Sequence, residues 1–198
     1  MKNKIIDALI SIGAVKFGEY KLKSGIISPI YLDLRILISF PELLKDIASL
    51  LTQPASSLQF DRIAGIPYTA LPIATAFSLE SGVPMVYCRK EKKEYGTAQQ
   101  IEGVWKEGET VLIIDDLITN GESKTETFTV YESAGLVVKD VIVLIDREQG
   151  GKERLEEQGY KLHALISIFE IIDRLKNLKQ ISESKYLEIT RFLSESFK

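Results

Sequence analysis

The fold of this chain is decided by the stretch Val111-Leu112-Ile113-Ile114-Asp115-Asp116-Leu117-Ile118-Thr119-Asn120-Gly121-Glu122-Ser123. The apolar run at 111–114 does not alternate with polar residues, so it predicts a strand that is covered on both faces. Two carboxylates and a small polar turn follow, and a helical pattern over 121–134 begins there. A helix N-terminus offers unpaired N–H groups and partial positive charge, so this turn predicts a phosphate-binding site.

Outward from this stretch, short apolar runs alternate with helical patterns. The runs that predict strands lie at 63–66, 83–88, 141–145 and 162–168, and the helical patterns lie at 70–81, 121–134 and 151–158. Strand, helix, strand order predicts an α/β fold, a parallel twisted sheet flanked by helices with right-handed crossovers. Ligands of such sheets bind beyond the carboxyl ends of the strands, which is where the acidic pair is expected.

The two ends of the chain follow other patterns. An N-terminal helix precedes a β-like stretch over 19–35, which Gly25 and Pro29 interrupt, and Pro41 opens a second helix. We expect residues 1–50 to form a cap, or hood, over the sheet, with C-terminal helices over 169–177 and 182–196 beside it. The longest turn-rich stretch is 52–59. We therefore expect one domain over 1–198, with its core over 60–168 and C-terminal helices over 169–198.

Composition narrows the function classes. A net charge of -3 argues against binding to nucleic acid or to an anionic membrane surface, which an excess of Lys and Arg would favour. Cys88 and His163 are single copies, so an intrachain disulfide and a Cys/His zinc cluster are excluded, and a cytoplasmic location is expected. No run of 18 apolar residues occurs, so no membrane span is expected. His163 lies in an apolar run and is expected to be structural.

Other interpretations of the acidic pair remain open at this point. In phospho-receiver domains the acidic pair ends the first strand, whereas here it ends about the third. Gly121-Glu122-Ser123-Lys124-Thr125 lacks the spacing of a P-loop. A structural helix cap with two solvated carboxylates also fits the pattern.

The segment 111–123 resembles the phosphoribosyl diphosphate signature of the type I phosphoribosyltransferases. The resemblance implies the type I phosphoribosyltransferase fold. It also implies that Asp115 and Asp116 bind the ribose hydroxyls and act in catalysis, and that the turn Leu117-Ile118-Thr119-Asn120-Gly121-Glu122-Ser123 binds the 5′-phosphate. The signature is specific for the superfamily and not for the base.

A basic loop follows the run at 83–88. Taken alone, Arg89-Lys90-Glu91-Lys92-Lys93-Glu94-Tyr95-Gly96 is also compatible with an ordinary solvated charge run. At the carboxyl end of a strand, however, Lys or Arg with Mg²⁺ would stabilise a departing diphosphate, and a polar loop with glycines can close as a mobile lid.

This loop resembles the corresponding loop of the orotate phosphoribosyltransferases. The resemblance implies that Arg89, Lys90, Lys93 and Tyr95 contact the diphosphate, with Lys93 in a catalytic role. It also implies a homodimer in which the loop reaches the partner's site. Many bacterial members have His where this chain has Tyr95, so a proton-transfer role for that His is not carried over.

The stretch 17–35, with Lys23-Ser24-Gly25 at its centre, resembles the N-terminal motif that separates orotate enzymes from their relatives. It implies that Lys23 contacts the diphosphate and the base, while Tyr31 and Leu32 line the orotate slot. Arg147 stands at the carboxyl end of the run at 141–145 and could pair with the carboxylate or ring carbonyls of orotate. In the family an Arg at this place and the Thr matching Thr119 contact orotate.

A second loop, Gly65-Ile66-Pro67-Tyr68-Thr69-Ala70, again joins a strand to a helix and is a candidate for holding the pyrophosphate through its N–H groups. By resemblance Tyr68 and Thr69 belong to this site. Many bacterial members have Lys at the position of Thr69, which predicts a weaker or backbone-only contact here.

Together these features predict a Mg²⁺-dependent orotate phosphoribosyltransferase that gives orotidine 5′-phosphate and pyrophosphate in pyrimidine biosynthesis. Mg²⁺ is expected to be bound mainly through the diphosphate, with no certain protein ligand. The alternatives are a transferase for another base, and a regulator that binds phosphoribosyl diphosphate without chemistry.

Overall fold

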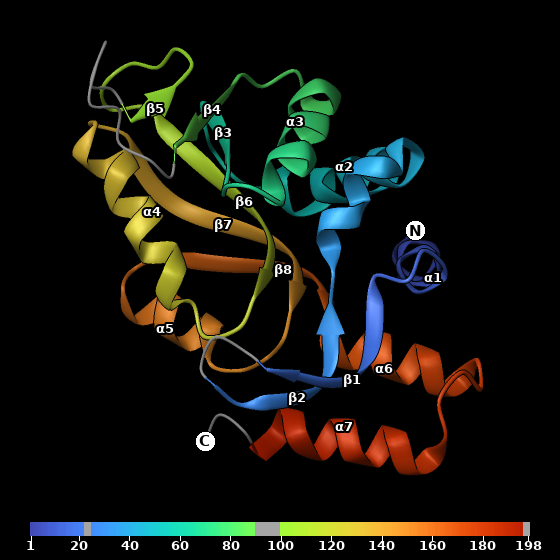
Figure 1. The fold of residues 1–198 in the computed structure, drawn as a ribbon. Coiled ribbons are helices and arrows are strands. Elements are labelled where there is room, and N and C mark those ends of the chain that lie inside the picture. Colours follow the sequence, from blue (N-terminus) through green and yellow to red (C-terminus); the bar gives the residue numbers. More distant parts are fainter. Residues whose placement is uncertain (22–24, 90–99, 196–198) are drawn as a thin grey trace.

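The computed structural model describes residues 1–21, 25–89 and 100–195 (Figure 1). Its centre is a six-stranded sheet in the order β5-β4-β3-β6-β7-β8. All pairs are parallel except β4 with β5, which are antiparallel, so the expected parallel α/β sheet is confirmed. The strands are β3 (Arg62–Gly65), β4 (Met85–Cys88), β5 (Ile101–Glu102), β6 (Thr110–Ile118), β7 (Val137–Asp146) and β8 (Lys161–Ser167).

Helices cover both faces of this sheet. Figure 1 shows α4 and α5 on one side and α1, α2, α3 and α6 on the other. The helices are α1 (Lys2–Ser11), α2 (Pro41–Ala55), α3 (Ala70–Ser81), α4 (Glu122–Ser133), α5 (Gly151–Glu157), α6 (Ile168–Asn177) and α7 (Glu183–Glu195). The helix expected at 70–81 is found at those bounds, and α4 ends just before Gly135, whose φ of 84° is left-handed.

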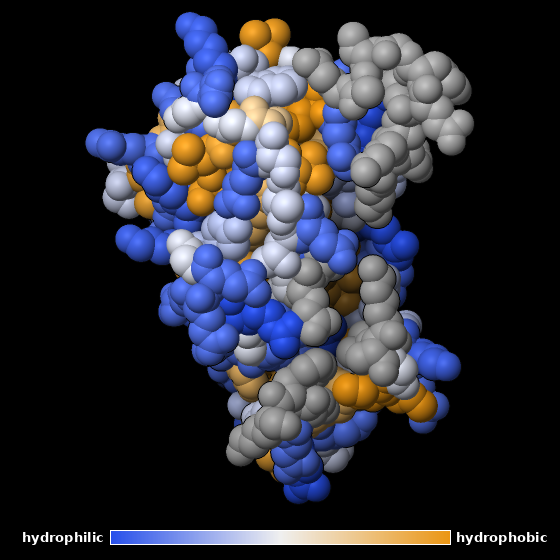
Figure 2. Space-filling view, turned by 90° about the vertical axis from the view of Figure 1, so that its left-hand side faces the viewer, coloured by the Kyte–Doolittle hydropathy of each residue, from blue (hydrophilic) through white to orange (hydrophobic). Residues whose placement is uncertain are grey.

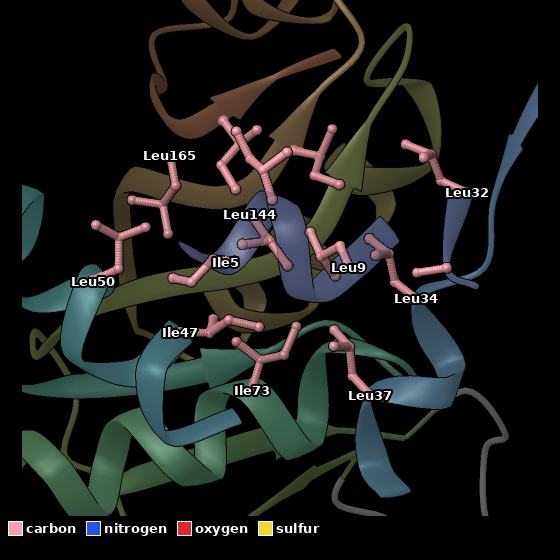
Figure 3. Packing of buried hydrophobic residues seen from close by; sticks show 14 of the residues in the cluster. Ile5, Leu9, Leu32, Leu34, Leu37, Ile47, Leu50, Ile73, Leu144 and Leu165 are labelled. Atoms are coloured by element: carbon pink, nitrogen blue, oxygen red, sulfur yellow. The ribbon is translucent and has the colours of Figure 1, made fainter. Parts of the chain in front are cut away.

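The alternation of side chains along β6 divides the apolar residues between two cores. Leu112 and Ile114 belong to the first core, to which α1, α2, α3 and α6 contribute (Figure 3). Val111 and Ile113 belong to the second core, together with Phe128 of α4. Successive residues of a strand point to opposite faces, so a continuous apolar run is what two covered faces require.

The N-terminal region agrees with the sequence prediction in part. The β-like stretch expected over 19–35, with its break at Gly25, corresponds to an antiparallel hairpin of β1 (Val15–Lys21) and β2 (Ile27–Leu32), but β1 begins earlier than expected, and a 3-10 helix, η1 (Leu34–Ser39), follows. Strand pairing ends at Leu32, and the chain then turns so that Leu34 and Leu37 enter the first core. Figure 1 shows the hairpin at the end of the molecule toward which β6 and β7 run, with α7 on its outer side.

Three other boundaries differ. The turn-rich stretch 52–59 is helical as far as Ala55, because α2 continues through Pro54 with Leu51 and Ala55 buried. The short strand β5 was not predicted. β6 extends to Ile118, so Asp115 and Asp116 lie inside the strand and not after it, because pairing with β7 continues to Ile118 opposite Asp146.

Figure 2 shows the face that carries α4 and α5, where hydrophilic residues predominate and apolar residues form separate groups. A hollow on the outer side of α4 is lined by Gln100, Ile101, Trp105, Thr129, Val130, Ser133 and Ala134. Within the described ranges, no helix is long and apolar enough to cross a membrane.

Candidate active site

The acidic pair lies near the carboxyl end of β6. Asp115 is 4% exposed and is directly followed by Asp116, which is partly exposed. Each carboxylate accepts a hydrogen bond from the next N–H: Asp116 N–H donates to Asp115 Oδ1 at 2.8 Å, and Leu117 N–H donates to Asp116 Oδ1 at 2.9 Å. These bonds fix the direction in which each carboxylate points.

A buried cation is paired with this acidic pair. Lys124, in the first turn of α4, is 6% exposed, and its ammonium forms an ion pair with Asp115. The same ammonium donates a hydrogen bond to the main-chain oxygen of Leu117 at 2.7 Å. Because α4 covers the face toward which Asp115 points, the helix supplies the counter-charge that a buried carboxylate requires.

The surroundings of Asp116 change its protonation. Burial, and then the neighbouring charge of Asp115, raise the pKa of Asp116 to about 8, although Lys124 acts in the opposite direction. A carboxylate next to another carboxylate loses its proton less readily, and the ion pair of the Lys124 ammonium is formed with Asp115. Below that pH the pair therefore carries less than two full negative charges.

The turn between β6 and α4 has the shape that the sequence predicts for a phosphate cradle. Gly121 is left-handed with φ of 77°, and α4 begins at the next residue. Thr119 and Asn120 are partly exposed in this turn. The structure does not describe the side chains of Glu122 and Ser123. The first N–H groups of α4 thus lie directly after the acidic strand.

The loop after β3 lies beside the acidic pair. Ile66 N–H donates to the main-chain oxygen of Ile114 at 3.0 Å, which brings this loop next to Asp115. A Cβ on Gly65 would lie 2.9 Å from the main-chain oxygen of Ala70, so α3 approaches the strand as closely as it does only because residue 65 is glycine. Tyr68 is 59% exposed, and its peptide bond to Pro67 is cis.

The segment after β7 contains buried polar groups without partners. Arg147 N–H donates to the main-chain oxygen of Ile118 at 3.0 Å, so Arg147 lies next to Thr119 at the same edge of the sheet. Its side chain is 5% exposed, and Nε and Nη2 have no hydrogen-bond partner among the described residues. Burial lowers the pKa of Arg147, yet a guanidinium keeps its charge in proteins. Gln149 is 3% exposed, and neither of its amide atoms is paired in the part of the chain described.

The ends of the basic loop are held together by a strand pair. Cys88 pairs with Ile101 across β4 and β5, and Arg89 N–H donates to the oxygen of Gln100 at 2.9 Å. The guanidinium of Arg89, expected on the diphosphate, is ion-paired with Glu102. Lys90, Lys93 and Tyr95 lie outside the described residues.

The predicted base-binding residues of the hairpin have these positions. Lys23 lies outside the described residues. Tyr31 stacks on Tyr20 with ring centroids 5.1 Å apart, and its hydroxyl accepts from Arg35 at 3.3 Å, so one face of its ring is already occupied. Leu32 is 6% exposed and packs in the first core (Figure 3), which leaves its main chain as the part that could contact a base.

Two site residues are absent from the sequence predictions. Lys124 was considered only as part of a P-loop spacing, and Gln149 was seen only as the neighbour of Arg147. A Lys in the first turn after an acidic strand was a usable signal, because that turn faces the strand end. Nothing in the sequence marked Gln149, since burial without a partner is a property of the packed turn.

His163, expected to be structural, lies on β8, and its Nε2 is 2.7 Å from Asp140 Oδ1. These two residues lie in the early part of their strands, away from the carboxyl edge that holds the acidic pair. Among the described residues, the lining of the hollow beside α4 includes no acidic, basic or histidine side chain. The acidic pair, the loop after β3 and Arg147 all lie where β3, β6 and β7 end.

In the described part of the chain, no group of three or more His, Cys, Asp and Glu is placed to hold a metal ion. The oxygens of Asp115 and Asp116 suit a hard cation such as Mg²⁺, which keeps few protein ligands and takes others from phosphates. The donor set fits a Mg²⁺ that would arrive with a diphosphate.

The chain matches a family model over residues 37–171, and that family is described as the phosphoribosyl transferase domain. It is 41% identical over 97% of its length to uridine 5′-monophosphate synthase of Bos taurus, of which it spans 40%. It is 39% identical over 96% of its length to orotate phosphoribosyltransferase of Caenorhabditis elegans, of which it spans 85%. Among solved structures, UMP synthase of Leishmania donovani superposes with a TM-score of 0.91 at 38% identity, covering 97% of this chain and 42% of that one.

Proposed function

Because this chain belongs to the phosphoribosyl transferase domain family, with an orotate phosphoribosyltransferase among its relatives, we propose that it transfers the phosphoribosyl group of phosphoribosyl diphosphate to orotate. The products are orotidine 5′-phosphate and pyrophosphate, and the reaction belongs to the synthesis of uridine monophosphate. The enzyme is then a pentosyltransferase. The composition favours a cytoplasmic location.

The observation that carries this proposal is the buried side chain of Arg147 beside the turn at 119–121, since its Nε and Nη2 have no hydrogen-bond partner among the described residues. A buried charge without a partner is costly, so its natural partner is an anionic ligand. Orotate supplies a carboxylate, whereas uracil and adenine do not. The planar guanidinium can donate two parallel hydrogen bonds to a carboxylate or contact ring carbonyls.

The acidic pair would bind the ribose. Asp115 and Asp116 point from neighbouring positions of one strand and accept hydrogen bonds from vicinal hydroxyls, while the first N–H groups of α4 bind the 5′-phosphate. The loop at 66–69 would hold the diphosphate through its N–H groups, and Thr69, the residue before α3, adds a hydroxyl.

The reaction would be a displacement at the anomeric carbon with an oxocarbenium-like transition state. The ring nitrogen of orotate forms the new bond, and the bond to the diphosphate oxygen breaks with its electron pair leaving on that oxygen. The Asp115 carboxylate offsets positive charge that develops on the sugar. Arg147 and Thr119 hold the base in line, so positioning and electrostatics supply the rate without a covalent intermediate.

The remaining parts come from segments outside the described residues. Lys23, Lys90, Lys93 and Tyr95 would contact the diphosphate, with Lys93 stabilising the charge that develops on it. When bound, Mg²⁺ would neutralise part of the diphosphate charge. We propose a homodimer in which the loop between β4 and β5 reaches the partner's site.

Turnover is measured by the loss of orotate absorbance with phosphoribosyl diphosphate and Mg²⁺, beside parallel assays with uracil, adenine and nicotinate. Orotate is expected to be consumed and the other bases left. Turnover of another base with none of orotate would assign a different transferase. Binding of phosphoribosyl diphosphate with no turnover of any base would indicate a regulator.

The donated loop is tested by mixing protomers. Lys93→Ala and Asp116→Asn should each be strongly impaired alone. After the two variants are unfolded and refolded together, about a quarter of wild-type activity should return, because half of the dimers are mixed and each has one complete site. No recovery, although mixed dimers are detected by mass, would contradict a loop that acts in the partner's site.

A further inference from the structure

Gln149 has a buried side-chain amide that lacks hydrogen-bond partners among the described residues. Its side chain is 3% exposed, and neither Nε2 nor Oε1 has a hydrogen-bond partner among the described residues. Buried side-chain amides in folded proteins are nearly always paired. A donor and an acceptor left together without partners indicate a place where a ligand with one acceptor and one donor would bind.

The turn that carries Gln149 is held by other residues. Asp146 Oδ1 accepts a hydrogen bond from Glu148 N–H at 2.8 Å, and Ser167 donates its hydroxyl to the carboxylate of Glu148. Glu148 has a φ of 53° and Gly150 a φ of 83°, so the backbone adopts left-handed conformations on both sides of Gln149. The turn therefore positions the amide, although the side chain of Gln149 forms no hydrogen bond with the described residues. This arrangement is expected of a group that binds a ligand.

The same turn is packed against the cradle. A Cβ on Gly151 would lie 2.7 Å from the main-chain oxygen of Thr119 and 2.6 Å from a side-chain carbon of Ile118. Arg147 N–H donates to the oxygen of Ile118 at 3.0 Å. Gln149 thus stands in the middle of the segment 147–151, and both ends of this segment, Arg147 and Gly151, contact the residues that follow the acidic pair on β6.

The unpaired side-chain groups of Arg147 and Gln149 match the hydrogen-bonding groups of one class of base. Arg147 offers two donors from a cation, and Gln149 offers one neutral donor and one acceptor. A pyrimidine-dione carboxylate requires such a set: an anionic carboxylate, and an imide edge on which one N–H lies between two carbonyls. Purines lack the carboxylate, and nicotinate lacks the imide edge.

We propose that Gln149 is a specificity-determining residue that recognises the imide edge of the base, with Oε1 accepting from the ring N–H and Nε2 donating to a ring carbonyl. This inference rests on the proposed function. It adds a neutral contact to the ionic one of Arg147, so the two residues together select a base that is both a carboxylate and an imide.

The test compares Gln149→Met with wild type. Methionine has a similar length and volume and no amide, so it keeps the packing and removes both hydrogen bonds. We expect kcat/KM for orotate to fall about thirtyfold, because two hydrogen bonds are left unmade, with KM for phosphoribosyl diphosphate within about twofold. The melting temperature should stay level or rise, since two unpaired buried polar atoms are removed. Gln158→Met, at an exposed position after α5, is the matched control and should leave all three quantities unchanged.

A substrate analogue separates recognition from a structural effect. Orotate methylated on the imide nitrogen cannot donate to Oε1, so wild type should use it at least about tenfold less well than orotate. Gln149→Met should discriminate clearly less between the two substrates. Equal discrimination by both proteins would overturn the inference. A parallel loss toward both substrates with a lower melting temperature would overturn it too, as a packing role.

Failure of the proposed function gives a different result. In that case wild type itself does not turn over orotate, and the inference falls with it. If wild type is active on orotate and Gln149→Met has the same kcat/KM, only the inference about Gln149 is wrong.

Discussion

Two neighbouring segments at the same edge of the sheet treat buried polar groups in opposite ways. At the end of β6, the carboxylate of Asp115 is paired with the ammonium of Lys124 from the same chain. After β7, the guanidinium of Arg147 and the amide of Gln149 are buried as deeply and lack partners among the described residues. The backbones of the two segments are joined by the hydrogen bond from Arg147 N–H to Ile118.

The difference separates two tasks. A buried charge that the chain neutralises itself keeps its place and its charge in the absence of ligand, which suits a carboxylate that must hold a sugar in a fixed orientation. A buried charge that the chain leaves unpaired gains a partner only when a ligand binds. A ligand that offers this partner removes the unfavourable free energy of the buried charge, so it binds more tightly than a ligand that does not. The comparison supports the proposal that the β6 segment orients a substrate and that the β7 segment selects it.

The strongest test of the comparison is Arg147→Met. Removing an unpaired buried charge should leave the free energy of unfolding unchanged or raise it, whereas kcat/KM for orotate should fall roughly a thousandfold, as expected when a site loses its polar contact. Urea unfolding and the orotate absorbance assay measure the two quantities. Arg191→Met, an exposed arginine on α7, is the control. Strong destabilisation by Arg147→Met would show that Arg147 has a structural partner. It would contradict the difference proposed between the β6 and β7 segments.

The opposite result is expected for Lys124→Met. This change leaves Asp115 buried without its counter-charge, so the free energy of unfolding should fall by roughly 3 kcal/mol at pH 7. The double variant with Asp115→Asn should recover most of this loss, because no unpaired charge remains. A Lys124→Met protein as stable as wild type in urea would refute the self-neutralised description of the β6 segment.

Asp116 makes the free energy of unfolding depend on pH, which gives a further test of the β6 segment. Its pKa is raised in the fold from an ordinary value of 3.8 to about 8, so the folded chain binds more protons than the unfolded chain between these values. This contribution to the free energy of unfolding is therefore present at low pH and is lost as the pH rises toward the folded-state pKa.

Asp116→Asn removes that dependence. Relative to wild type, the variant should gain stability as the pH rises from 5 to 8, by about 1.4 kcal/mol for each pH unit below the folded-state pKa. Unfolding in urea at both pH values measures it. A difference between variant and wild type that is equal at the two pH values would mean that Asp116 ionises normally in the folded chain.

The smallest effect is expected from His163→Asn, which lies outside both segments. Its contact with Asp140 is partly exposed, so the loss of stability should stay below about 1 kcal/mol and kcat/KM should change by less than twofold. A large fall in kcat/KM would show that His163 contributes to catalysis although it lies away from the edge formed by β3, β6 and β7.

Particular residues show how much of the fold could be predicted from the sequence. The run at 111–114 predicted a strand with two covered faces, and Leu112 and Val111 do enter different cores. The helix at 70–81 was predicted at its observed bounds, and the structure shows that it ends at the left-handed Gly82. The β-like stretch over 19–35 with its break at Gly25 was confirmed in part, because β2 lies within it, but the start of β1 at Val15 was missed, since the pairing of Val15 with Leu32 depends on contacts distant in sequence.

The site was predicted unevenly for a related reason. Asp115, Asp116 and Arg147 were identified because a carboxylate or a guanidinium at a strand end is visible in the sequence. Lys124 and Gln149 were missed, because a lysine is usually exposed and a glutamine carries no charge. Their roles depend on burial and on which atoms lack partners.

The sequence alone determined the alternation of strands and helices in the core, the parallel sheet and the edge at which a ligand is expected, because these follow from local periodicity and from the handedness of crossovers. Only the tertiary structure decided that Asp115 is paired with Lys124, while buried polar atoms of Arg147 and Gln149 have no partner among the described residues. Local patterns specify which groups are present, but the free energy of a buried polar group depends on the atoms around it, and packing brings those atoms together from different elements.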